Sequence, residues 1–101
     1  MDIIFFESDP TYTHPFYQKH IVFTGALEAM TRSSAAKLIR DVGGILQGAV
    51  NEQTNFVVLG NKRKGVSSKE LKARLLEAQG NDLQIINEAD FFWLIQMAHY
   101  E

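Results

Sequence analysis

The residues with the clearest chemical potential are Thr24 and Gly25, which end the short apolar run HIVFTG (20–25). This ending is compatible with an ordinary strand followed by a turn, and equally with one wall of a phosphate pocket. A hydroxyl and a backbone amide both donate hydrogen bonds to phosphate oxygens, and glycine lets the backbone approach a ligand closely. Both interpretations stay open at this point.

Positive charge is concentrated later in the chain. Residues 62–74 contain six basic residues and one acidic residue, Glu70, so this stretch carries +5 in a chain whose net charge is −2. A basic patch on an acidic body suits an anionic ligand that is met at one place. A solvated loop and helix face is the more common reason for such a run. The six basic residues are Lys62, Arg63, Lys64, Lys69, Lys72 and Arg74.

No set of residues suggests catalysis or metal binding. The chain has no cysteine, and its histidines (His14, His20 and His99) are too dispersed for a metal-ligand spacing. The segment GNKRKG (60–65) lacks the Gly-Lys-Ser/Thr ending of a phosphate-binding P-loop. Acidic residues at expected helix ends, among them Glu88, are explained by capping and ordinary surface roles. We therefore expect no enzyme activity, no metal and no cofactor.

Length and composition predict one soluble domain. The chain has 101 residues, of which 46% are hydrophobic and 22% are charged. No apolar run approaches the roughly 18 residues of a membrane span, and the first ten residues are too acidic for a secretory signal. Residues 1–19 hold both prolines and are interpreted as an arm or linker, and residues 20–101 as the domain. We expect a cytoplasmic protein, or a fragment of one.

Hydrophobic patterning predicts alternating strands and helices. Short apolar runs with turn residues on both sides indicate strands, and apolar residues at helical spacing indicate helices. Strands are expected at 20–24, 45–50, 55–60 and 83–86, and helices at 31–42, 67–79 and 87–98. This order favours an α/β fold with a mostly parallel sheet and helices on its faces.

Caps and apolar stripes support the helix positions. Thr31, Ser67 or Ser68, and Asn87 are expected N-caps. The first expected helix has apolar residues at helical spacing, and the second places Leu71, Leu75 and Ala78 on one face. The stripe of the first helix consists of Ala35, Leu38, Ile39 and Val42.

Five segments in this order and spacing resemble a BRCT domain over residues 20–97. They are IVFTG, GG, TNFVVLG, SSKELKA and INEADFFWLI. The chain is most similar to the branch found in bacterial NAD-dependent DNA ligases, the large subunit of replication factor C and polymerase III epsilon-type exonucleases. The resemblance implies a four-stranded parallel sheet in the order 2-1-3-4. It places the first and third helices on one face of the sheet and the second helix on the other.

The resemblance also implies a phosphate site at Thr24, Gly25 and Lys69, where the first strand ends near the start of the second helix. In DNA-end-binding members an arginine opening the first helix contacts DNA, and Arg32 stands at that position. Lys72 and the loop residues 62–64 could follow the adjoining DNA backbone. The plainer alternatives are a strand-end cap for Thr24 and solvated surface positions for Lys69 and Arg32.

Three functions remain open. The first is a module that binds a 5′-phosphorylated DNA end, nick or recessed junction without sequence specificity. The second is a protein-interaction module that takes a phosphopeptide in the same pocket or docks a partner on the stripe Trp93, Met97 and Tyr100. That stripe could instead pack under the apolar residues 3–6. The third is a structural appendage of a larger enzyme. The isolated domain is expected to be a monomer.

Overall fold

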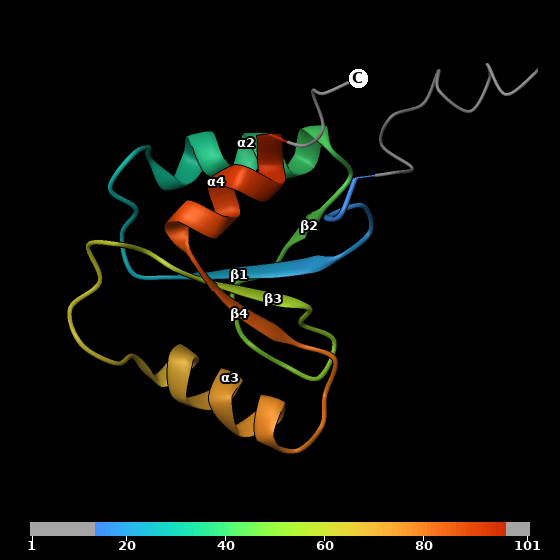
Figure 1. Cartoon of the computed structure of the whole chain (residues 1–101), viewed down its shortest axis with the longest axis vertical. Helices are drawn as coiled ribbons and strands as arrows, with labels where there is room; N and C mark the ends of the chain where they lie inside the picture. Colours follow the sequence, from blue (N-terminus) through green and yellow to red (C-terminus); the bar gives the residue numbers. More distant parts are fainter. Residues whose placement is uncertain (1–13, 97–101) are drawn as a thin grey trace, which may run out of the picture.

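The computed structural model describes residues 14–96. Within this range the sheet is parallel throughout and its strands lie in the order β2-β1-β3-β4. The elements in chain order are β1 (His20–Thr24), α2 (Arg32–Asp41), β2 (Ile45–Leu46), β3 (Phe56–Leu59), α3 (Ser68–Ala78), β4 (Gln84–Asn87) and α4 (Glu88–Gln96). Helices α2 and α4 lie together on one face of the sheet and α3 on the other (Figure 1). The predicted fold and strand order are confirmed.

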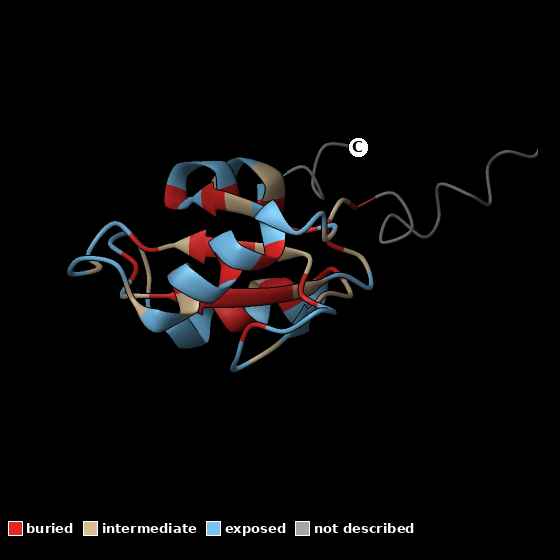
Figure 2. Ribbon diagram, turned by 90° about the horizontal axis from the view of Figure 1, so that it is seen from below, coloured by how far each residue is buried: buried red, intermediate tan, exposed pale blue. Residues whose placement is uncertain are grey.

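Side chains of the two central strands alternate between two cores, because successive strand residues point to opposite faces. Ile21 and Phe23 of β1 face α2 and α4, whereas Val22 faces α3. Figure 2 shows the buried residues gathered in the central layer and exposed residues along the outer sides of the helices. Phe91 of α4 is fully buried, with its ring centroid 5.3 Å from that of Phe23.

The turn before β1 contributes to the core. Phe16 is fully buried, and its ring stacks on Phe91 with the centroids 5.8 Å apart. His14 is also buried, and its Nε2 lies 3.4 Å from the carbonyl oxygen of Ile95. Residues 14–19, which the sequence assigned to the arm, therefore include side chains packed against α4.

The helices begin where their capping residues predict. The side chains of Thr31, Ser67 and Asn87 accept hydrogen bonds from the amides three residues later. These bonds satisfy donors that have no partner inside the helix. The loops before α2 and α3 are thereby tied to the helix starts.

Helix α3 turns a different face to the sheet from the one predicted from Leu71, Leu75 and Ala78. Leu71 and Leu75 are 61% and 55% exposed, and Ala78 is exposed as well. The sheet-facing residues are Ala73 and Leu76. The apolar stripe predicted on this helix is thus a surface ridge.

In the part of the chain that the structure describes, no helix is both long and apolar enough to span a bilayer.

Candidate phosphate-binding site

The candidate site begins where β1 ends. Thr24 is the last residue of β1 and pairs with Leu59, the last residue of β3, so both strands end at the same edge of the sheet. Gly25 follows with φ +83°, and a Cβ at this position would collide with the side chain of Arg63. Glycine is therefore required here for conformation and for space. Between residues 14 and 96, no group accepts a hydrogen bond from the Gly25 amide.

Lys69 brings a positive charge to the same edge. It lies in the first turn of α3, and its Nζ donates to the carbonyl oxygen of Phe23 over 3.4 Å. The first-turn amides of a helix have no intrahelical acceptor, and they carry the positive end of the helix dipole. The ammonium group and the start of α3 therefore both face the end of β1.

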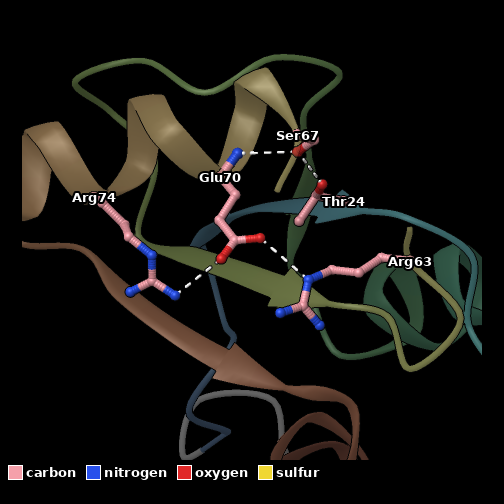
Figure 3. A network of polar contacts seen from close by, with 5 residues as sticks. All are labelled: Thr24, Arg63, Ser67, Glu70 and Arg74. Carbon is pink, nitrogen blue, oxygen red and sulfur yellow. Dashed lines mark hydrogen bonds and ion pairs between the residues drawn. The ribbon is translucent and has the colours of Figure 1, made fainter. Parts of the chain in front are cut away.

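Thr24 is joined to the start of α3 by a hydroxyl pair. Its Oγ1 lies 2.5 Å from Oγ of Ser67, and Thr24 is only 2% exposed. The same Ser67 oxygen accepts the amide of Glu70 over 3.1 Å. Figure 3 shows this chain from Thr24 through Ser67 to Glu70. Ser67 thus caps α3 and also forms a hydrogen bond with the hydroxyl of Thr24. Capping preferences alone do not predict this second hydrogen bond.

Arg32 lies against the loop that follows Thr24. One of its terminal nitrogens donates to the carbonyl oxygen of Gly25 over 3.3 Å, and its guanidinium carbon lies 5.4 Å from the ring centroid of Phe23. A cation over an aromatic face gains a modest electrostatic attraction. The structure therefore brings Thr24, Gly25, Arg32 and Lys69 together around the end of one strand.

The other basic residues divide into two groups. Lys62, Lys64 and Lys72 are exposed. Arg63 is instead turned toward Glu70: its Nε lies 3.1 Å from one carboxylate oxygen, and Arg74 contacts the other oxygen over 2.9 Å (Figure 3). The Nε of Arg63 is therefore engaged by Glu70, whereas Arg63 was predicted from the sequence to contact the DNA backbone.

Glu70 is 2% exposed, and burial alone would raise the pKa of its carboxyl. Hydrogen bonds from Arg74 and Arg63, and their charges, outweigh burial and bring the pKa below the ordinary glutamate value. The carboxylate is charged at neutral pH, and its single negative charge is shared by two of the six cations that the sequence concentrates here.

Glu88 is a second buried carboxylate near the site, and its assignment to a surface role was wrong. It is 2% exposed and accepts the amides of Ala29 and Asn61, each over 2.8 Å. The Glu28 amide contacts both carboxylate oxygens over 2.9 Å. Burial would raise the pKa of Glu88, but these amides and the nearby charge of Lys62 lower it below its ordinary value.

The partner surface predicted on the last helix is only partly described. Trp93 of α4 is 65% exposed, and Met97 and Tyr100 lie outside the described residues. Among residues 14–96, no three His, Cys, Asp or Glu side chains gather in a way that could hold a metal ion.

Comparison with known proteins finds one family model and several bacterial relatives. Residues 11–95 match the model of the BRCA1 C Terminus (BRCT) domain. The chain is 41% identical over 81 residues to a DNA ligase of Protochlamydia amoebophila, covering 80% of this chain and 11% of the ligase. It is 36% identical over 86 residues to a DNA ligase of Bradyrhizobium, covering 85% and 11%. A DNA ligase of Acholeplasma laidlawii is 31% identical over 86 residues, covering 85% and 12%. The chain thus spans only about a tenth of the length of these relatives.

Proposed function

We propose that this chain, which belongs to the BRCT domain family, is a non-catalytic DNA-binding module of a cytoplasmic replication or repair protein. Its ligand is a 5′-phosphorylated DNA end, nick or recessed junction, recognised without sequence preference. Because phosphate contacts position a protein on DNA without reading bases, such a module needs a phosphate site and no base-reading groups.

The observation that carries this proposal is the convergence of donors at the end of β1. The Lys69 ammonium lies 3.4 Å from the Phe23 carbonyl, and the Gly25 amide, two residues further along the chain, is without an acceptor among residues 14–96. A phosphate oxygen placed between them would receive a charged donor and a backbone donor, the combination that suits a compact dianion. The start of α3 adds its dipole to the same place.

Two further side chains complete the proposed contacts. The Thr24 hydroxyl is held at this edge by Ser67 and would donate to the same phosphate. Arg32 lies beside Gly25 and would reach the next phosphate along the strand. The exposed Lys62, Lys64 and Lys72 would follow the adjoining backbone. Because these contacts displace counterions, affinity should fall steeply as salt concentration rises.

Fluorescence anisotropy with two labelled duplexes tests the proposal. One duplex carries a recessed 5′-phosphate, and the other carries a 5′-hydroxyl at the same position. Wild-type protein should prefer the phosphorylated duplex, and Lys69→Ala should remove most of that preference while the fold stays intact. Equal binding of both duplexes by the wild type would reject the phosphate site.

Lys19→Ala is the matched control. Lys19 is exposed and directly precedes β1, so it lies at the opposite end of the strand, about 20 Å from Gly25 at roughly 3.3 Å per residue. It removes the same charge as Lys69→Ala. A loss of preference in Lys19→Ala equal to that in Lys69→Ala would mean that net charge is responsible.

Partner docking on α4 is a second candidate, supported by the 65% exposure of Trp93. A large aromatic side chain in water is typical of a contact residue. Trp93→Ala should then weaken binding of a protein partner and leave DNA binding unchanged. If wild-type protein bound neither duplex, the DNA proposal would be rejected in favour of this one or of a structural appendage.

A further inference from the structure

We propose that Glu88 is a positioning residue for the candidate phosphate site, because its carboxylate fixes the two loops that carry the site. This inference rests on the function proposed above. Glu88 is the first residue of α4, and its hydrogen bonds within residues 14–96 go to loop amides and not to the proposed phosphate-binding residues. Its effect is exerted through the backbone of the loops β1–α2 and β3–α3.

The carboxylate bridges the loops directly. From the β1–α2 loop it accepts the amides of Glu28 and Ala29, and from the β3–α3 loop it accepts the amide of Asn61. The first loop runs from Gly25 to Thr31 and leads into α2 at Arg32, and the second runs from Gly60 to Ser67 and leads into α3, which carries Lys69. One buried side chain thus spans both segments that bring donors to the end of β1.

Two weaker links run parallel to this bridge. The Asn61 side-chain amide donates to a carboxylate oxygen of Glu28 over 3.2 Å, and the Lys62 amide donates to the carbonyl of Ala26 over 3.0 Å. Glu88 takes part in neither of these hydrogen bonds. Both can form only when the two loops lie side by side. The carboxylate is the central and buried member of the set.

The chemistry of the bridge requires a carboxylate. Both oxygens are occupied: one accepts from Glu28 and Asn61, the other from Glu28 and Ala29. An ionised carboxylate only accepts hydrogen bonds, whereas a glutamine side chain carries an NH₂ group in place of one oxygen. In Glu88→Gln that group would face the amide of either Ala29 or Asn61, so at least one hydrogen bond between the carboxyl side chain and the loops would be lost.

The direction of the effect on DNA binding separates positioning from simple charge. Removing a negative charge near a DNA site ordinarily strengthens binding. Positioning predicts that Glu88→Gln instead lowers the preference for the phosphorylated duplex, by about fivefold, the change expected when one hydrogen bond is lost. Asp90→Asn is the matched control, because Asp90 is exposed on the same helix turn and undergoes the same change of charge.

A second measurement does not depend on DNA. In the protein without DNA, Glu88→Gln should shift the NMR amide signals of Gly25 and Lys69 and leave in place that of Ile45 in β2, which pairs with His20 at the other end of β1. Asp90→Asn should shift none of the three. If Glu88→Gln does not fold, Glu88→Asp replaces it: this variant keeps the charge but retracts the carboxylate by one methylene, and the same shifts are expected.

The outcomes distinguish the two proposals. Unmoved Gly25 and Lys69 signals in Glu88→Gln, or a phosphate preference that equals or exceeds the wild-type value, would overturn the positioning role. If the wild type shows no phosphate preference, the proposed function is wrong, and the amide signals alone then decide whether Glu88 positions the loops.

Discussion

Two buried glutamates stand beside the candidate site, and they are satisfied in opposite ways. Glu70 and Glu88 are each 2% exposed. The oxygens of Glu70 are held by the side chains of Arg63 and Arg74, whereas those of Glu88 are held by three backbone amides of two loops. The first arrangement pairs charge with charge, and the second uses a charge to shape the backbone.

Because of this difference, Glu70 affects the positive charge near the site, whereas Glu88 affects the conformation of its loops. Glu70 shares its single negative charge between Arg63 and Arg74. Among the described residues, the other four basic residues of this stretch form no ion pair: Lys62, Lys64, Lys69 and Lys72. Glu88 forms no ion pair within residues 14–96, although the charge of Lys62 is near enough to lower its pKa, and its carboxylate instead joins the two loops beside Gly25 and Lys69. We therefore expect substitutions of Glu70 to change the strength of DNA binding, and substitutions of Glu88 to change its selectivity.

The largest expected effect is on stability. Glu88→Ala should lower the free energy of unfolding by about 3–5 kcal/mol, because several backbone donors lose a charged acceptor. Glu70→Ala should cost only about 1–2 kcal/mol, because the freed arginines can turn to water. Their side chains are already 33% and 53% exposed. Urea denaturation measures the free energy of unfolding of both variants. An equal loss in the two, or a larger loss in Glu70→Ala, would contradict the distinction between the two glutamates.

The second prediction concerns pH. Both carboxyls have a pKa below the ordinary glutamate value in the folded state. As pH falls below that ordinary value, the unfolded chain takes up protons first, so stability present at neutral pH is lost progressively until the folded pKa is passed. Urea denaturation at a series of acidic pH values should show a shallower decline for Glu88→Gln and for Glu70→Gln than for wild type.

Salt sharpens this second prediction. The charges of Arg63 and Arg74 contribute to the lowered pKa of Glu70, and both arginines reach solvent, so added salt should screen part of that contribution. Hydrogen bonds from backbone amides are screened less. Of the two carboxylates, Glu88→Gln retains only Glu70 and Glu70→Gln retains only Glu88. Raising the salt concentration should therefore reduce the loss of stability at acidic pH more in Glu88→Gln than in Glu70→Gln. An identical salt response in both variants would contradict the distinction drawn between the two carboxylates.

Much of the fold and of the proposed ligand set could be predicted from the sequence. Strand patterning and helix caps depend on neighbours a few residues away, and the BRCT family resemblance is confirmed by the family match. Gly25 and Lys69 could be placed because one ends a strand and the other opens a helix. Their role in phosphate binding stays a prediction.

The two buried carboxylates mark the limit of sequence reasoning. The partners of Glu88 are backbone amides 27 to 60 residues away, and every residue except proline offers such an amide, so no residue type reveals them. The apolar stripe predicted on α3 was wrong for another reason: Leu71 and Leu75 share a face, but the side packed against the sheet is the one that carries Ala73 and Leu76. Helical spacing groups residues without saying which group is buried.

The third prediction concerns DNA affinity. Glu70→Gln should raise affinity for the phosphorylated and unphosphorylated duplexes alike, by about threefold to tenfold at low salt, because two arginines lose their anionic partner. The ratio between the two duplexes should stay at the wild-type value. Anisotropy titrations with both duplexes measure the two quantities together.

Glu77→Gln is the control for this third prediction. Glu77 is exposed on the same helix, and its removal changes the net charge equally without freeing an arginine. Its effect on affinity should be smaller than that of Glu70→Gln. A similar gain in both variants would show that Arg63 and Arg74 add nothing beyond net charge.

The smallest expected effect lies on the same helix as Glu88. Trp93 is five residues further along α4 and 65% exposed, so Trp93→Ala should change the free energy of unfolding by less than about 0.5 kcal/mol. Its DNA affinity and its preference for a 5′-phosphate should stay within about twofold of wild type, since the buried first residue of α4, and not its exposed face, joins the loops of the site. Urea denaturation and the same two duplexes provide the test. A loss of phosphate preference in Trp93→Ala would mean that the packing of α4 also positions the site. The Glu88 carboxylate would then not be the sole cause of the effect assigned to it.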